Sequence, residues 1–187
     1  MKKPKITTSN IIFLIVILLL VIPQTRQPIQ VFFHKGLAKI SPSTITNSDQ
    51  EKLTDYNWNL VDQNGKPFNL EKAKEKVIFI NFWATWCPPC IAEMPSIEAL
   101  YKDYNDKVVF LLVSDEKPEK IKAFNTKNNY SFNFYNPVSP PPSSFETRSI
   151  PRTFVVDKSG NIVIDKGGAA NWNSKTVRET LDRLLSE

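Results

Sequence analysis

Two cysteines separated by two prolines, Cys87 and Cys90, are the residues of this chain best suited to covalent chemistry. They follow the apolar run 77–83 and precede a segment with helical spacing, so the expected order is strand, cysteine pair, helix. A cysteine at the N-terminus of a helix lies beside unpaired backbone N–H groups and the positive end of the helix dipole, which stabilise a thiolate. A second cysteine one turn on can close a disulfide with the first, so the pair could exchange two electrons. We therefore expect Cys87 to be the exposed nucleophile and Cys90 the resolving thiol.

Two other uses of a cysteine pair compete with redox chemistry. A structural zinc site takes four ligands, usually two cysteine pairs or cysteines with histidines. The chain has two cysteines and one histidine, His34, which lies far upstream, so zinc is disfavoured. A purely structural disulfide is also disfavoured, because a two-residue loop constrains little of the unfolded chain. With five glycines and no dinucleotide-binding or phosphate-binding glycine motif, we expect no cofactor and no metal.

The length and charge of the chain limit its organisation and its partners. After an N-terminal hydrophobic segment, the 187 residues leave enough chain for one domain of ordinary size. The net charge of +5 is spread along the chain rather than gathered into a basic tract. Nucleic acid is therefore not an expected partner.

The N-terminal segment is typical of membrane targeting. An uncharged apolar run occupies residues 11–22, and Pro23 closes it. The run is shorter than the ~20 residues of a full spanning helix and has the length of a signal-peptide core. No small-x-small cleavage site follows, so we predict an uncleaved anchor over 1–40, with the apolar residues of 29–33 in the membrane interface. A cleaved signal and a buried soluble helix are the alternatives.

Charge barely decides which side of the membrane the rest of the chain faces, because the basic residues flanking the apolar run nearly balance. They are Lys2, Lys3 and Lys5 before the run, and Arg26, Lys35 and Lys39 after it. The signal-like layout favours a single N-terminal anchor with the domain outside.

Beyond a polar linker over 41–56, the sequence predicts one α/β domain over 57–187. The continuously apolar run 77–83 indicates a central strand covered on both faces. Apolar residues at helical spacing predict a helix over 88–104, bent by Pro95. The other expected elements are a hairpin over 58–70 around an Asn-Gly turn, a strand over 108–113, a helix over 116–128, an extended stretch over 132–135, a polyproline loop over 137–144, a second hairpin over 153–164 and a helix over 174–185.

The cysteine segment also carries a family resemblance. Residues 82–90 read Phe-Trp-Ala-Thr-Trp-Cys-Pro-Pro-Cys, and Glu93 and Pro95 follow. This pattern resembles thioredoxin-fold proteins, and most of all the membrane-anchored TlpA/ResA branch of thiol-disulfide oxidoreductases. The resemblance covers about residue 57 to the C-terminus. It implies a thioredoxin-like α/β fold, with a central mixed sheet flanked by helices and an extra N-terminal β-hairpin, preceded by the membrane anchor.

The resemblance implies an enzyme that mainly reduces disulfides in exported proteins, apocytochrome c being one substrate in the family. Cys87 would attack the substrate disulfide, and Cys90 would resolve the mixed disulfide. Since the chain has no nicotinamide or flavin motif, a membrane thiol donor would re-reduce the pair. The family also implies that the domain lies outside the cytoplasmic (inner) membrane, facing the periplasm or the exterior.

Three alternatives stay open at this point. The same thiol-disulfide exchange in the opposite direction would make the protein a disulfide oxidase. The redox potential of the cysteine pair distinguishes a reductase from an oxidase. The cleft could instead serve a non-enzymatic chaperone or carrier that binds a peptide or a metal. A peroxiredoxin shares the fold, but its Thr-x-x-Cys motif needs threonine where Ala84 stands.

The resemblance also indicates which residues bind substrate. Ile150-Pro151 stands where the family has a cis-proline beside the cysteine pair. A cis bond would turn the Ile150 backbone toward Cys87, where an incoming peptide could pair like an added strand. The expected substrate-binding residues are Trp86, Pro88, Ile150 and Pro151.

The proton chemistry departs from the thioredoxin pattern. Asn81 stands where thioredoxin has a buried aspartate that handles the proton of the resolving cysteine, and asparagine cannot do acid–base work. We predict that Glu93, on the turn after Cys90, takes this role. The alternative is an ordinary exposed glutamate on the helix.

Two prolines between the cysteines remove backbone N–H groups that could otherwise stabilise the Cys87 thiolate. The N–H groups of Cys90 and Ile91 remain, and a nearby Glu93 carboxylate would disfavour the thiolate further. We therefore predict a reducing pair, with a potential nearer to that of thioredoxin, about −270 mV, than to that of DsbA, about −120 mV.

Overall fold

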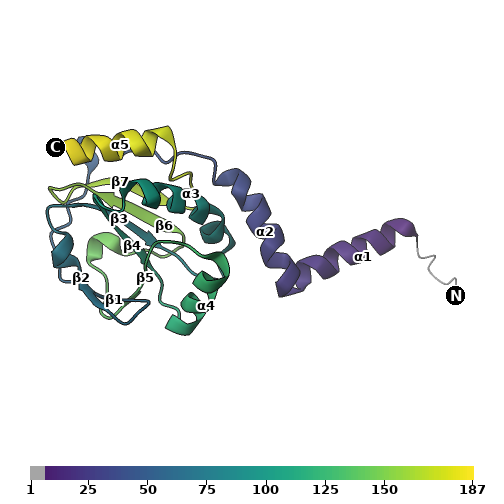
Figure 1. The fold of residues 1–187 in the computed structure, drawn as a ribbon. Helices are drawn as coiled ribbons and strands as arrows, with labels where there is room; N and C mark the ends of the chain where they lie inside the picture. Colours follow the sequence, from purple (N-terminus) through teal and green to yellow (C-terminus); the bar gives the residue numbers. More distant parts are fainter. Residues whose placement is uncertain (1–6) are drawn as a thin grey trace.

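The computed structural model describes residues 7–187, so Lys2, Lys3 and Lys5, the basic residues before the apolar run, lie outside the described residues. Within this part of the chain, seven strands form one sheet (Figure 1). They are β1 (Asn59–Asp62), β2 (Pro67–Asn69), β3 (Val77–Phe82), β4 (Val108–Val113), β5 (Phe134–Pro137), β6 (Arg152–Val156) and β7 (Ile162–Gly167). Their order is β2-β1-β5-β4-β3-β6-β7. The β3–β4 and β4–β5 pairs are parallel and the other pairs antiparallel, so the sheet is mixed.

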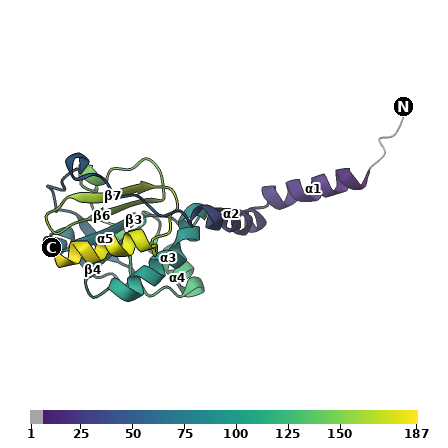
Figure 2. The same ribbon diagram turned by 90° about the horizontal axis from the view of Figure 1, so that it is seen from above.

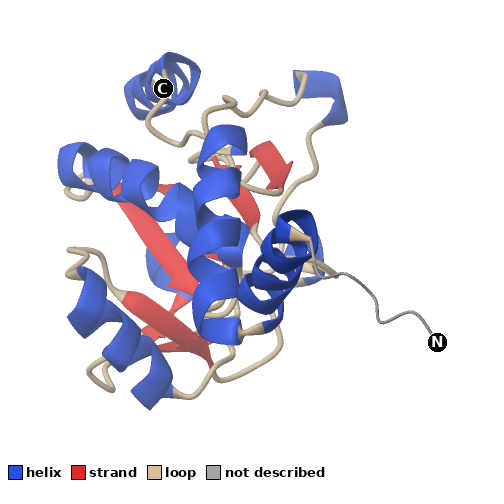
Figure 3. Cartoon of the chain, turned by 90° about the vertical axis from the view of Figure 1, so that its right-hand side faces the viewer, coloured by secondary structure: helices blue, strands red, loops and turns tan. Residues whose placement is uncertain are grey.

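The helices fall into an N-terminal pair and a set that belongs to the domain. The α-helices are α1 (Thr8–Val21), α2 (Pro23–Leu37), α3 (Pro88–Tyr104), α4 (Pro118–Asn128) and α5 (Lys175–Ser186), and the short 3₁₀ helices are η1 (Asn47–Asp49), η2 (Leu70–Ala73) and η3 (Ser143–Phe145). Helices α3, α4 and α5 cover the same face of the sheet, because Met94, Ile121 and Leu181 belong to one buried core. Figure 3 shows the helices and strands from the side on which α1 projects. The predicted hairpin around Asn64-Gly65 is β1 and β2, which add two antiparallel strands at one edge.

Strand β3 lies inside the sheet, between β4 and β6, and its apolar side chains alternate between two buried cores. Phe79 lies in the core that the helices cover, together with Met94 of α3 and Leu181 of α5. Ile80 lies in the core on the other face, together with Leu70 of η2. A strand that is apolar at nearly every position can thus be buried on both faces. This arrangement fixes the C-terminal end of β3, from which the cysteine loop starts.

Three element boundaries differ from the predicted ones. Strand β5 includes Pro137, which pairs with Leu60 of β1, so the polyproline stretch is shorter than expected and ends where η3 begins. Helix α4 begins at Pro118 rather than at 116, because the fixed backbone of proline suits the first turn of a helix. Strand β7 continues to Gly167, which pairs with Arg152.

The segment predicted as a linker, 41–56, packs on the domain. The Leu53 N–H donates to the Gly160 carbonyl over 2.8 Å, and the Ile162 N–H donates to the Glu51 carbonyl over 2.8 Å. Leu53 and Tyr56 are buried in the second core. These two apolar residues are too few and too widely spaced to show a period in the sequence, which is why the segment resembles a linker. The domain therefore uses chain that starts before residue 57.

We expect Leu53→Ala to lower the free energy of unfolding by about 2–5 kcal/mol, because Leu53 is 1% exposed and its removal leaves a cavity. The neighbouring exposed residue offers a matched control, Lys52→Ala, which should change the free energy by less than about 0.5 kcal/mol. Urea denaturation followed by tryptophan fluorescence measures both. Equal stability of the two variants would contradict the packing of this segment.

The N-terminal anchor predicted over 1–40 consists, where described, of two helices rather than one. Helix α1 has no buried residue and projects away from the domain in two perpendicular views (Figures 1 and 2). Helix α2 starts at Pro23, after a sharp bend, and packs against α3. Within residues 7–187, no single helix has the length and apolar character needed to cross a bilayer. Together, the two helices reach this length and apolar character, but their axes meet at an angle of 89°.

Candidate active site

The two cysteines lie at the start of α3, directly beyond the end of β3, as the sequence predicts. They form a disulfide, with 5.3 Å between their Cα atoms. Cys87 is the N-cap residue of α3, and Pro88 and Pro89 occupy the first helical positions. Proline is tolerated there because the first N–H groups of a helix have no partner within the helix.

Among the described residues, the backbone offers the Cys87 sulfur a single hydrogen-bond donor. The Cys90 N–H donates to Cys87 Sγ over 3.3 Å. Pro88 and Pro89 have no N–H to give. The Ile91 N–H, which we expected to be a second donor, points instead to the Cys87 carbonyl, at 3.1 Å. The positive end of the helix therefore stabilises a thiolate on Cys87 less than a proline-free turn would.

The expectation that Cys87 is exposed is wrong for this oxidised form. Its residue exposure is 3%, and that of Cys90 is 1%. Both cysteines belong to the helix-covered core, together with Met94, and the disulfide joins their sulfurs there. The neighbouring Trp86 side chain stays 63% exposed and marks where the site meets the surface.

Glu93 is a buried carboxylate surrounded by donors. Its residue exposure is 1%, which rules out the alternative of an ordinary exposed helix glutamate. Asn81 Nδ2 donates to Oε1 over 2.9 Å, whereas Trp172 Nε1 and the Ala170 N–H donate to Oε2 over 2.8 and 3.1 Å. Burial raises the pKa of Glu93 from 4.5 to about 7, against the lowering effect of these hydrogen bonds and of Lys166. A carboxyl with this pKa can take up or release a proton near neutral pH.

Asn81 links the glutamate to the strand that follows the proline loop. Besides its bond to Glu93, Asn81 Nδ2 donates to Thr153 Oγ1 over 2.7 Å. The asparagine thus occupies the buried position at which thioredoxin has an acid, and it contacts the acid that this chain has instead. Trp172 and Ala170, the other partners of Glu93, are far from it in the sequence, and no sequence pattern identified them.

The Ile150–Pro151 peptide bond is cis, as expected from the resemblance. Pro151 is buried, and Ile150 is half-buried against the core that contains both cysteines. Arg152 forms an ion pair with Asp165 of β7 and so belongs to the β6–β7 hairpin. The structure therefore brings the predicted binding residues Ile150 and Pro151 into the core region of the cysteine pair.

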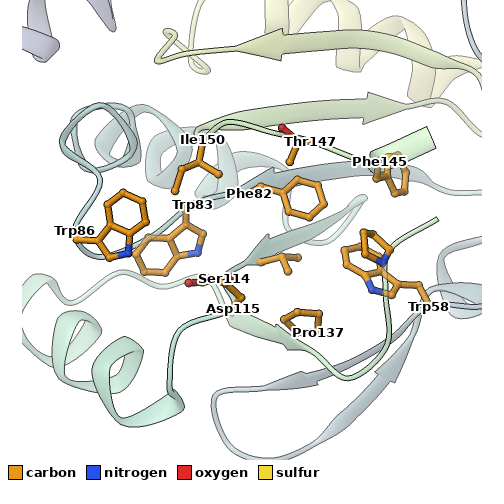
Figure 4. A pocket seen from close by; sticks show the side chains of 12 residues that line it. Trp58, Phe82, Trp83, Trp86, Ser114, Asp115, Pro137, Phe145, Thr147 and Ile150 are labelled. Carbon is orange, nitrogen blue, oxygen red and sulfur yellow. The ribbon is translucent and has the colours of Figure 1, made fainter. Parts of the chain in front are cut away.

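A groove of about 290 Å³ begins beside the cysteine loop and runs across the sheet end (Figure 4). Trp86 and Ile150 lie near one end of it, and Trp58 and Phe145 near the other. Its lining is mostly aromatic or aliphatic, and Asp115 is its single ionisable residue. Such a groove suits an apolar side chain of a polypeptide. No local pattern in the sequence indicates this groove, because Trp58, just before β1, and Phe145, in η3, are both remote from the cysteines.

The described residues, 7–187, contain no group of three or more histidines, cysteines or acids placed to hold a metal ion. The chemistry available at this site is that of two sulfurs, a buried carboxyl and an apolar groove.

Comparison with known proteins identifies the family. Residues 48–184 match the Redoxin family. The chain is 33% identical over 137 residues to the thioredoxin-like protein YneN of Bacillus subtilis (strain 168), a match that covers 71% of this chain and 79% of that protein. It is 34% identical over 110 residues to the thiol-disulfide oxidoreductase ResA of Bacillus thuringiensis (strain Al Hakam), which covers 57% of this chain but only 64% of ResA.

Solved structures support the same fold. A secreted thiol-disulfide isomerase from Corynebacterium glutamicum superposes with a TM-score of 0.59 at 19% identity, over 77% of this chain and 91% of that one. At this identity the likeness concerns the fold alone, and the thioredoxin-like fold predicted from the sequence is confirmed. Taken together with the Cys-Pro-Pro-Cys site and the matched residues, these findings show that the chain belongs to the Redoxin family, as a relative of the ResA-type thiol-disulfide oxidoreductases.

Proposed function

We propose that this thiol-disulfide oxidoreductase works mainly as a reductant of disulfides in exported proteins. The observation that carries the proposal is that Cys87 Sγ, in the disulfide, receives one backbone donor within residues 7–187, the Cys90 N–H at 3.3 Å, so a thiolate formed there would have weak support. A reduced form that is poorly stabilised gives up its electrons more readily. Apocytochrome c is among the substrates we propose, on the ground of the resemblance to ResA.

The reaction has two exchange steps. The Cys87 thiolate attacks one sulfur of the substrate disulfide, a Cys87–substrate disulfide forms, and the other substrate sulfur leaves as a thiolate. Cys90 then loses its proton and attacks Cys87 Sγ, which closes the Cys87–Cys90 disulfide and releases the second substrate thiolate. Two electrons pass from the pair to the substrate. Glu93, buried one turn beyond Cys90, is the group that we propose accepts the Cys90 proton.

Substrate binding would combine backbone pairing with the groove. We propose that Pro88 and Trp86 contact the substrate around its disulfide, that the segment Ile150–Pro151 holds its backbone, and that the groove accepts a neighbouring apolar side chain. The exposure of Trp86 and the apolar lining of the groove support these roles.

We further propose that the chain is attached to the cytoplasmic membrane through its N-terminus, with the domain on the outer side and a membrane thiol donor as the source of electrons. Helix α1 supports this, because its residues 11–21 are apolar and its side chains are exposed all round. Within residues 7–187 nothing buries the side chains of this helix, and we propose that lipid covers them.

The reductase direction predicts a low redox potential. Equilibration of the cysteine pair with defined glutathione mixtures should give a redox potential nearer to about −270 mV than to about −120 mV. A value above about −180 mV would favour the oxidase alternative. Replacing both prolines, Pro88→Ala with Pro89→Ala, restores two N–H groups and should raise the potential, whereas Pro118→Ala at the start of α4 is a matched control that should leave it unchanged.

A further inference from the structure

The helix that connects α1 to the domain lies beside the catalytic edge. Figures 1 and 2 both show α2 on the side of the domain from which α1 projects, next to α3. Gln27 of α2 donates through Nε2 to the Thr85 carbonyl over 2.8 Å. Thr85 is two residues before Cys87, so α2 is fixed to the loop that carries the reactive pair.

Helix α2 has one face toward the domain and another toward the surroundings. Its half-buried residues include a set at helical spacing, Gln27, Gln30, Val31 and His34, besides Thr25 and Ile29. Between them, Phe32 and Phe33 are 74% and 71% exposed. Exposed phenylalanines on a helix with basic residues are typical of helices that lie in the interface of a bilayer.

The charge of this part of the chain matches an anionic surface. The first acidic residue of the sequence is Asp49, whereas Arg26, Lys35 and Lys39 lie on or just after α2. A basic helix with exposed aromatics is the composition that binds the headgroup layer of a bilayer containing anionic lipid. The bend of 89° between the two helices would place α2 along the bilayer surface when α1 enters the lipid perpendicular to it.

We propose that α2 and Trp86 together rest on the headgroup layer of an anionic bilayer, so that the edge of the domain carrying Cys87 and Cys90 faces the membrane. This proposal rests on the membrane attachment proposed above and specifies it. Trp86 fits the surface, because it is 63% exposed and follows the residue to which α2 is bonded. The thiol partners of the enzyme are then polypeptides whose cysteines lie at the level of the lipid headgroups.

The tryptophans of the chain make this orientation measurable. Trp58, Trp83 and Trp172 are 0–2% exposed, whereas Trp86 is 63% exposed. The full chain, reconstituted into phosphatidylcholine–phosphatidylglycerol vesicles with brominated acyl chains, should therefore show quenching of Trp86 by the lipid. The quenched component is read as the difference between wild type and Trp86→Phe. We expect it to be about twofold larger with anionic vesicles than with phosphatidylcholine alone, and to weaken with added salt.

A paired variant tests the part played by α2. Phe32→Ser with Phe33→Ser should reduce the quenching of Trp86 at least about twofold, while α1 still holds the protein on floated vesicles. Val138→Ser, which removes an apolar side chain that is 67% exposed on the domain, should leave the quenching unchanged.

Each contrary result has a distinct meaning. Flotation with the vesicles but no Trp86 quenching would overturn the proposed surface and leave the membrane attachment standing. Failure to float would overturn both. Quenching that disappears as cross-linked dimers form would overturn the lipid surface and assign the patch to a second copy of the chain. Disulfide reductase activity in detergent is measured separately and depends on neither result.

Discussion

Replacing Cys87 by alanine should abolish the reduction of insulin disulfides, lowering the rate by at least about 10³-fold, to that of the added thiol alone. The reason is that Cys87 is the N-cap residue of α3, next to the exposed Trp86, whereas Cys90 lies within the first turn of the helix. The measurement is turbidity of the reduced insulin chains with dithiothreitol as donor.

The companion variant Cys90→Ala separates the two exchange steps. It keeps the attacking sulfur but lacks the resolving one, so a Cys87–substrate disulfide should accumulate and be visible on a non-reducing gel. The chain has two cysteines in all, so any adduct of this variant forms at Cys87. Insulin reduction that survives Cys87→Ala would contradict the proposed chemistry. Peptide binding without turnover in the wild type would favour the non-enzymatic chaperone.

The free energy of unfolding should fall by about 3 kcal/mol between pH 4.5 and about 7 because of Glu93, and Glu93→Gln should remove this fall. The pKa of this carboxyl is about 7 in the folded chain, against 4.5 for the ordinary group, so the folded state holds the proton more tightly than the unfolded state. The contribution to stability is therefore complete below pH 4.5 and is lost as the pH rises to about 7, which corresponds to about 3 kcal/mol at most. Urea denaturation across this range measures the slope.

Two comparisons make the assignment to Glu93 specific. Glu119→Gln, an exposed substitution of the same kind on α4, should leave the slope of the wild type unchanged. Glu93→Gln should also slow the release of substrate from the mixed disulfide about 10²-fold, because proton transfer from Cys90 loses its acceptor. A variant with the wild-type slope and the wild-type release rate would show that Glu93 has neither role.

Local patterns explain why the reactive segment could be predicted from the sequence. The order of β3, cysteine pair and α3 follows from an apolar run, two cysteines and helical spacing within about thirty residues. Glu93 could be proposed because it lies on the turn after Cys90. These inferences need only the geometry of one strand and one helix.

Contacts between distant segments explain what could not be predicted. Trp172 and Ala170 are 79 and 77 residues from Glu93, so nothing near the glutamate in the sequence indicates that its carboxylate has three donors. The same applies to Leu53, whose backbone bonds to Gly160. The burial of Cys87 depends on a core that distant residues such as Phe134 and Trp172 complete, which the spacing of the two cysteines does not fix.

The construction of the groove has a consequence for how such a protein can diversify. Its far wall consists of Trp58 and Phe145, which belong to neither the cysteine loop nor α3. Substitutions at these two positions would reshape the wall and leave the single donor to Cys87 Sγ and the three donors to Glu93 in place. Selectivity for a substrate polypeptide and the redox potential of the cysteine pair therefore depend on different residues of this fold. Evolution can change one of these properties while the other stays the same.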